Sequence, residues 1–134
     1  MEHLLEVKNL SVSIDGPSGE VQAVRDVSFS LKKGEVLAIV GESGCGKSVL
    51  CKSIMKLLPP RAKIKEGSIS VNGQDITCYR EKEMQKLRGR IFSMIFQDPM
   101  TSLNPTIKIG KQIAEAVLIH NKNYTKEQVN QKVL

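Results

Sequence analysis

Two stretches of the chain are apolar at almost every position instead of alternating with polar residues. The first is Val36–Val40, and the second is Ile91–Phe96, which contains a single serine. Short apolar runs without alternation are typical of strands that are buried on both faces, as in a parallel sheet. We therefore predict that both segments are strands of a buried central sheet.

Other segments alternate between apolar and polar positions with a period of about two. Leu4–Ile14 and Val21–Leu31 show this pattern and are separated by the turn-forming cluster Asp15–Gly19. A third short segment, Ser68–Gly73, ends in Asn-Gly, the dipeptide favoured in tight hairpin turns. These patterns predict an antiparallel hairpin or small sheet, with a further strand at Ser68–Gly73.

Four segments have helical character, either from apolar residues spaced three or four apart or from helix-favouring composition. Pro59-Pro60 is expected to end the helix that begins at Val49, and Thr125 with Gln128 forms a capping box at the start of the helix from Lys126. The predicted helices are Val49–Leu58, Arg80–Arg88, Ile107–His120 and Lys126–Leu134.

Composition limits the possible classes of protein. With 134 residues, of which 40% are hydrophobic and 25% charged, the chain fits one globular domain. No apolar run approaches the roughly 18 residues that cross a bilayer, the first residues do not resemble a signal peptide, and the cysteines are an odd three without metal-ligand spacing. We therefore expect a cytosolic protein. The net charge of +6 is spread along the chain and only 4% of residues are aromatic, so we do not expect nucleic acid as a partner.

The segment after the first apolar run carries the chemistry. Gly41–Ser48 reads Gly-Glu-Ser-Gly-Cys-Gly-Lys-Ser and matches the phosphate-binding loop (P-loop) pattern Gly-x-x-x-x-Gly-Lys-Ser/Thr at every fixed position. Glycines in such a loop let main-chain N–H groups approach an anion, and the following helix directs the positive end of its dipole at the same place. In this arrangement Lys47 reaches the β and γ phosphates and the Ser48 hydroxyl ligates Mg²⁺. The loop alone does not distinguish ATPases, GTPases and kinases.

A second motif narrows the choice. About fifty residues after the loop, an apolar segment ends in Gln97-Asp98-Pro99, which resembles the Q-loop of ABC transporter ATPases. The run Phe96–Pro105 is similar to that of ATP-binding subunits of oligopeptide and dipeptide importers, with nickel importers as close relatives. The opening segments Leu5–Val12 and Val24–Phe29, and Gly34-Glu35 before the loop, fit the same family, so the resemblance covers essentially the whole chain.

The resemblance implies a fold and a set of site residues. The fold would be α/β, a P-loop NTPase (ABC ATPase) core with an antiparallel β subdomain, truncated in the helical subdomain. Lys47 and Gln97 would take part in catalysis, Ser48 and Gln97 would ligate Mg²⁺, and Ile14 would contact adenine in place of the usual aromatic ring. The residues assigned to ATP around the loop are Gly41, Glu42, Ser43, Gly44, Cys45, Gly46, Lys47, Ser48 and Val49.

The resemblance also implies partners and a domain layout. The β subdomain and core would extend to about residue 105, and the helical subdomain would begin at about 106. Two membrane-spanning permease subunits, a second ATPase subunit and, indirectly, a substrate-binding protein would be the partners, at the cytoplasmic face of the membrane. The chain ends at Leu134, before the segments in which the family carries its Leu-Ser-Gly-Gly signature and catalytic glutamate. We therefore expect uncovered apolar strand edges, weak nucleotide binding and negligible turnover.

Alternatives remain open at this point. The transported solute could be nickel or another small molecule, because the ATPase subunit seldom touches the cargo. The chain could instead be a truncated, non-hydrolytic binding or interaction remnant. A DNA-repair or translation ATPase with the same core is disfavoured by the Thr101–Pro105 run.

Overall fold

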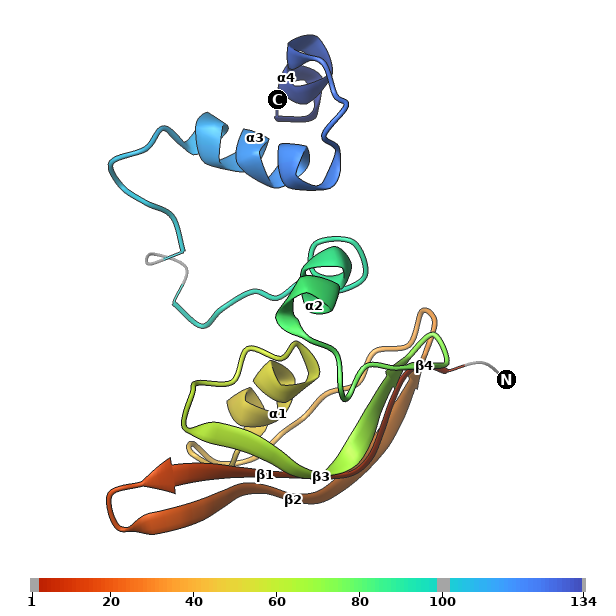
Figure 1. Cartoon of the computed structure of the whole chain (residues 1–134), viewed down its shortest axis with the longest axis vertical. Coiled ribbons are helices and arrows are strands. Elements are labelled where there is room, and N and C mark those ends of the chain that lie inside the picture. Colours follow the sequence, from red (N-terminus) through yellow and green to blue (C-terminus); the bar gives the residue numbers. More distant parts are fainter. Residues whose placement is uncertain (1–2, 99–101, 134) are drawn as a thin grey trace. The chain divides into compact units, whose positions relative to one another are not determined.

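The computed structural model describes residues 3–98 and 102–133, and the chain divides into two compact units, Met1–Glu81 and Lys82–Leu134. The first unit contains the sheet and the phosphate-binding loop. The second contains most of α2 together with α3 and α4 (Figure 1).

The first unit is built on a four-stranded antiparallel sheet in the order β2-β1-β3-β4. Its strands are β1 (His3–Gly16), β2 (Gly19–Lys32), β3 (Ala62–Val71) and β4 (Gln74–Asp75). Pro17 and Ser18 form the tight connection between β1 and β2, which confirms the predicted hairpin. Asn72 and Gly73 connect β3 to β4 with φ values of 49° and 75°, as expected for an Asn-Gly hairpin turn.

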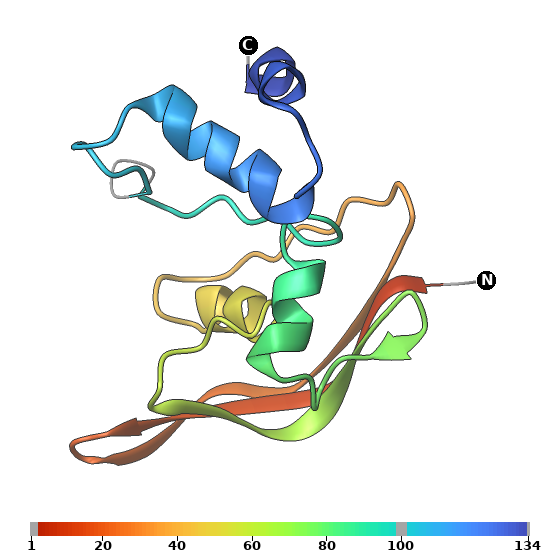
Figure 2. The same ribbon diagram turned by 45° about the horizontal axis from the view of Figure 1, so that its top comes forward.

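One helix, α1 (Lys47–Ile54), lies over one face of this sheet, as Figures 1 and 2 both show. Leu50 and Ile54 of the helix are buried, and so are Val7 and Leu10 of β1. Val7 and Leu10 are three positions apart because the pairing register shifts between them, where Asn9 takes a φ of 48°. This bulge explains why the alternation along β1 is only approximate in the sequence.

The two fully apolar segments are not strands, so this part of the sequence prediction is wrong. Val36–Val40 has no regular secondary structure, and the side chains of Val36 and Val40 are 93% and 88% exposed. In Ile91–Phe96, Phe92 forms one isolated bridge with Arg88, and Ile95 is 97% exposed. A strand exists only when a neighbour completes its hydrogen bonds, and the four strands of the described residues pair with one another instead. Apolar side chains of both segments are exposed, as expected, but they belong to irregular chain and not to strand edges.

The helices of the second unit agree with the predictions. They are α2 (Glu81–Leu87), which begins at the last residue of the first unit, α3 (Ile109–His120) and α4 (Lys126–Val133). The capping box forms as predicted: the Thr125 N–H donates to Gln128 Oε1 at 2.9 Å, and the Gln128 N–H donates to Thr125 Oγ1 at 3.3 Å.

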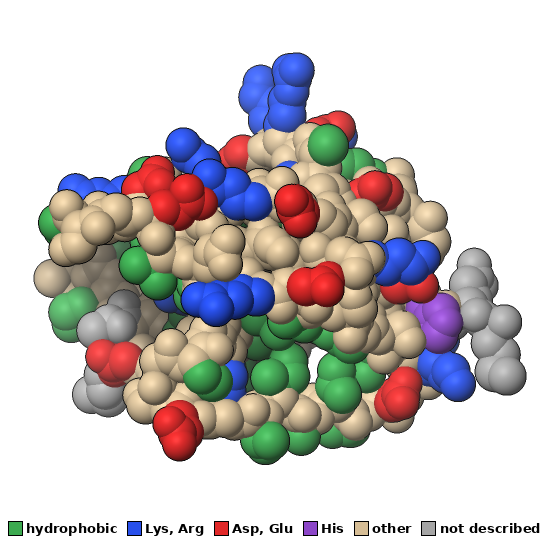
Figure 3. Space-filling view, turned by 90° about the horizontal axis from the view of Figure 1, so that it is seen from below, with side chains coloured by type: hydrophobic (Ala, Val, Ile, Leu, Met, Phe, Trp, Pro, Cys, Tyr) green, Lys and Arg blue, Asp and Glu red, His purple; other side chains and the backbone are tan. Residues whose placement is uncertain are grey.

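No helix in residues 3–98 and 102–133 is both long enough and apolar enough to cross a membrane. On the face seen in Figure 3, Lys and Arg side chains are interspersed with Asp and Glu side chains and do not form a single basic patch. This distribution agrees with the sequence, in which the excess positive charge is scattered.

Candidate phosphate-binding site

The phosphate-binding loop is an exposed turn that leads directly into α1. The Cys45 N–H points to the Glu42 carbonyl at 3.4 Å and closes the middle of the loop. Gly46 is the N-cap of α1, with a φ of 93°, and the first helical hydrogen bond runs from the Leu50 N–H to the Gly46 carbonyl at 2.9 Å. The predicted transition from loop to helix is therefore present, with the helix beginning at Lys47.

The start of α1 has the features of an anion site. The N–H groups of the first helical residues, Lys47, Ser48 and Val49, precede the first helical bond and have no acceptor within the helix. Gly46 offers no side-chain cap, and the first turn holds no acidic residue. The positive end of the helix dipole is thus not neutralised by its own terminus.

The Lys47 side chain curls back over the loop that precedes it. Its Nζ donates to the Gly41 carbonyl at 2.7 Å and to the Glu42 carbonyl at 2.5 Å, and it lies 3.4 Å from the Cys45 Sγ. An ammonium group has three donors and binds an anion more strongly than a neutral carbonyl. A phosphate at this place would therefore compete with these two carbonyl groups for Lys47.

Two glycines of the loop occupy places where a larger residue does not fit. A Cβ at Gly46 would collide with the carbonyl oxygen of Ala23 in β2 and approach the Val24 side chain to 3.8 Å. A Cβ at Gly41 would lie 2.7 Å from the Cys45 Sγ. The loop therefore packs tightly both against the sheet and against itself. Together with the uncapped helix start and Lys47, this geometry fits a polyphosphate group.

Ile14 lies near the end of β1, opposite Val21 of β2 and Ala62 of β3. It is partly exposed, whereas Val12 is fully buried. Both are paired to β3 without a register shift between them, so they share one face of the sheet. Val12 is also paired with Val24, which borders Gly46, so Ile14 lies two residues along β1 from the residue that faces this part of β2. Contact of Ile14 with adenine stays a prediction.

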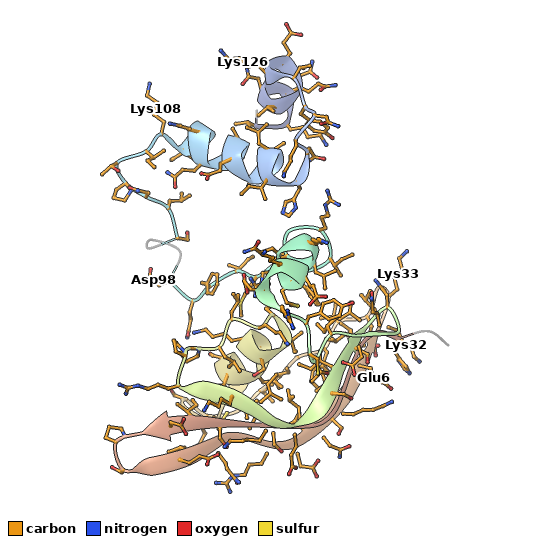
Figure 4. All side chains as sticks on the ribbon, in the orientation of Figure 1. Glu6, Lys32, Lys33, Asp98, Lys108 and Lys126 are labelled. Atoms are coloured by element: carbon orange, nitrogen blue, oxygen red, sulfur yellow. The ribbon has the colours of Figure 1, made fainter. Side chains whose placement is uncertain are left out.

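Gln97 belongs to the second unit, where it is exposed in a segment without regular structure. Figure 4 labels the next residue, Asp98. Pro99, Met100 and Thr101, which carry part of the family resemblance, lie outside the described residues. The pairing of Ser48 and Gln97 at one metal ion therefore stays a prediction.

Comparison with known proteins identifies the family. A family model described as ABC transporter matches residues 24–133, which include both the phosphate-binding loop and Gln97. The chain belongs to the ABC transporter family.

The relatives of this ABC transporter family chain include several named for peptide transport. It is 53% identical over 133 residues to the dipeptide transport ATP-binding protein DppD of Lactococcus lactis, covering 99% of this chain and 38% of that protein. It is 58% identical over 120 residues to the oligopeptide transport ATP-binding protein OppD of Bacillus subtilis, covering 89% of this chain and 34% of that protein. The chain thus spans little more than a third of the length of these relatives.

Solved structures confirm the predicted ABC ATPase fold. A dimeric ATP-binding cassette, MJ0796, in a post-hydrolysis state bound to ADP and Pi, matches with a TM-score of 0.79 at 20% identity, over 96% of this chain and 53% of that one. The structure of cbiO1 from Clostridium perfringens, part of the transporter complex cbiONQ, matches with a TM-score of 0.71 at 22% identity, over 98% of this chain and 48% of that one.

The sequence motif predicts which residues bind phosphate, but it does not predict which contacts hold those residues in place. Ala23 of β2 contacts the loop through its carbonyl oxygen, which every residue type possesses, so no side-chain pattern could have revealed it. Lys56, which follows α1, binds main-chain carbonyls twenty-one and twenty-three residues further along the chain. Neither contact could be inferred from local spacing.

Proposed function

We propose that this chain is the nucleotide-binding part of an ATP-binding subunit of an ABC importer that takes up peptides. The observation that carries the proposal is the junction of loop and helix. The helix start is uncapped and has no acidic residue in its first turn, and the ammonium group of Lys47 binds the loop carbonyls of Gly41 and Glu42. The names of the relatives, which are dipeptide and oligopeptide transport ATP-binding proteins, support the choice of solute.

In this proposal each residue has a defined task. Main-chain N–H groups of Gly41–Val49 bind the phosphates of ATP, and Lys47 balances their negative charge. Ser48 supplies a hydroxyl and Gln97 an amide oxygen to Mg²⁺, and Gln97 also orients water. ATP supplies the phosphoryl group whose transfer drives transport, and such transfer depends chiefly on positioning and charge stabilisation. Ile14 gives adenine an aliphatic contact.

The proposed subunit is attached to the cytoplasmic face of the membrane by its partners. These are two membrane-spanning permease subunits and a second ATPase subunit, with a substrate-binding protein acting indirectly. Within the chain, residues up to about 105 belong to the core and the remainder to a helical subdomain. We expect residues 1–134 alone to bind ATP weakly and to hydrolyse it negligibly, because no acidic residue in them is assigned as the catalytic base.

Binding of a fluorescent ATP analogue with Mg²⁺ to the 134-residue chain tests the nucleotide site. Lys47→Ala is expected to weaken binding at least about tenfold, the loss typical of a hydrogen-bonded charge on phosphate. Lys52→Ala is the matched control, since it removes a lysine from the same helix at the end away from the loop. Equal affinities of the wild type and Lys47→Ala would reject the assignment, and absence of binding in the wild type would favour the interaction-remnant alternative.

The exposed Val36–Val40 segment supports the alternative of a binding or interaction remnant, because exposed apolar segments are typical of protein-binding surfaces.

The transported solute is tested separately, in cells that carry the protein. Lys47→Ala should abolish uptake of a labelled tripeptide and leave uptake of radioactive nickel unchanged. The reverse result would favour the nickel alternative.

A further inference from the structure

The C-terminal end of α1 has an unusual residue at its stop position. The Lys56 N–H donates to the Ser53 carbonyl at 3.1 Å, and the Leu57 N–H donates to the Lys52 carbonyl at 2.8 Å. These two bonds form a Schellman motif, in which the residue at the place of Lys56 is left-handed and is usually glycine. Lys56 has a φ of 51°, so the chain places a long side chain where its backbone disfavours one.

The side chain of Lys56 makes contacts that account for this choice. Its Nζ donates to the carbonyl oxygen of Thr77 and, at 2.8 Å, to that of Tyr79. Both acceptors lie in the connection between β4 and α2, and the side chain is half-buried. One lysine thus ties the end of the loop-bearing helix to a segment that follows the sheet.

The acceptor segment is itself held firmly to the sheet. The Thr77 N–H donates to Asp75 Oδ1 at 2.7 Å, and the Thr77 Oγ1 accepts the N–H of Ile69 in β3 at 2.8 Å. Ile76, between them, is fully buried. The Lys56 side chain therefore donates to a segment that is itself hydrogen-bonded to the sheet.

We propose that Lys56 is a positioning residue for the phosphate-binding loop, because it fixes the direction of α1 relative to the sheet. This inference rests on the proposed function, since the loop at the other end of α1 is the proposed phosphate site. Gly46, packed against the Ala23 carbonyl, sets how closely the helix start approaches the sheet, and Lys56 sets where the other end lies.

The length of the helix explains why its far end matters. Eight residues span about 12 Å, so a tilt of about 10° around the middle moves each end by about 1 Å. Hydrogen bonds from N–H groups to oxygen are confined to a range of about 0.5 Å. A small tilt therefore takes N–H groups at the start of α1 out of reach of a phosphate without unfolding the helix.

The test compares Lys56→Met with Lys52→Met in the 134-residue chain. Lys52 lies in the last turn of α1 and Lys56 just beyond its end, so each variant removes one positive charge from the same end of the helix. Within the described residues, the carbonyl groups of Thr77 and Tyr79 accept from Lys56 and not from Lys52. The Kd of MgATP is expected to rise about fivefold in Lys56→Met, the effect of one poorly made hydrogen bond, and to stay within about twofold in Lys52→Met. Lys56→Arg, which retains several donors, should recover part of the affinity.

Two further measurements separate positioning from simple loss of stability. Adenosine has no phosphate group. If Lys56 positions the phosphate-binding loop, Lys56→Met should lower the affinity for ATP more than the affinity for adenosine, whereas general destabilisation should weaken the binding of both ligands equally. Lys56→Gly removes the clamp but relieves the left-handed backbone, so it should weaken ATP binding while retaining more of the thermal stability than Lys56→Met does. An unchanged affinity ratio in both variants would overturn the inference.

A wild-type chain that fails to bind ATP would reject the proposed function but would still leave Lys56 testable. Amide hydrogen exchange without nucleotide would then show whether Lys56 holds the whole of α1 in place. The Leu50 amide, which is bonded to Gly46 at the far end of the helix, should exchange faster in Lys56→Met than in Lys52→Met. Faster exchange confined to Met55 and Leu57 would indicate local fraying only, and it would overturn the positioning role.

Discussion

Replacing Gly46 by alanine tests how tightly the phosphate-binding loop is packed against the sheet. Gly46 combines a left-handed backbone, with a φ of 93°, and a Cβ position that collides with the Ala23 carbonyl oxygen. The chain offers two matched controls. Gly73 has a φ of 75° and Gly44 a φ of 82°, and a Cβ at either position would meet nothing within 4 Å.

The controls separate the two costs of the substitution. An alanine at any of the three sites bears the left-handed conformation, which costs about 1 kcal/mol. At Gly46 the Cβ also forces the helix start away from β2, since the obstructing atom belongs to a strand backbone and cannot rotate aside. Overpacking of this kind adds about 2 kcal/mol. We therefore expect losses of about 1 kcal/mol for Gly44→Ala and Gly73→Ala and of about 3 kcal/mol for Gly46→Ala.

Urea denaturation followed by far-ultraviolet circular dichroism measures these losses, because the chain contains no tryptophan for fluorescence. MgATP binding provides the second readout. Gly73→Ala lies outside the loop and should retain the wild-type affinity, whereas Gly46→Ala should lose it. Equal free energies of unfolding for Gly46→Ala and Gly73→Ala would refute the close approach between loop and sheet.

Two further predictions concern other parts of the first unit. Hydrogen bonds from the Thr77 side chain and backbone hold the pKa of Asp75 below its usual 3.8. The ionised Asp75 therefore stabilises the fold above pH 3.8, and this stabilisation is lost as the pH falls through the lower pKa of the folded state. In urea titrations, Asp75→Ala should be less stable than the wild type at pH 7, and the difference in free energy of unfolding should narrow below pH 3.8. A margin independent of pH would contradict this assignment. The exposed apolar segment Val36–Val40 should bind the dye ANS, so replacing both Val36 and Val40 by serine should reduce the ANS fluorescence. Val21→Ser, which alters an exposed valine near the β1–β2 turn, should reduce it less. Equal reductions would show that Val36–Val40 is not the dye site.

The parts of the fold that were predicted from sequence have their determinants within a few residues. The Asn72-Gly73 turn depends on two residues that both accept a positive φ, and the capping box depends on Thr125 and Gln128, three positions apart. The start of α1 follows from the glycine-rich loop in the same way. Each of these features is specified by residues that are close together in the sequence.

The predictions that failed needed information from distant parts of the chain. Val36–Val40 has the composition of a buried strand, but a strand forms only when neighbouring strands complete its hydrogen bonds. Composition does not show whether such neighbouring strands are present. The end of α1 is a similar case. Proline signals placed it at Leu58, whereas the helix ends at Ile54 and Lys56 turns into the left-handed region to reach Thr77.

The exposure of Val36–Val40 also bears on how well the loop can bind phosphate. This segment leads into Gly41 but makes no ladder that would fix the loop entrance. The charged group that binds the entrance is Lys47, through the Gly41 and Glu42 carbonyls, and the Cys45 N–H adds a longer contact to the Glu42 carbonyl. A phosphate would have to draw the same ammonium group away from those carbonyls, so part of the binding free energy is offset by loosening the loop. The exit of the loop is held independently, by Gly46 against Ala23. The eight-residue motif therefore predicts which anion is bound, while the affinity depends on how firmly the residues before Gly41 are held by something other than Lys47.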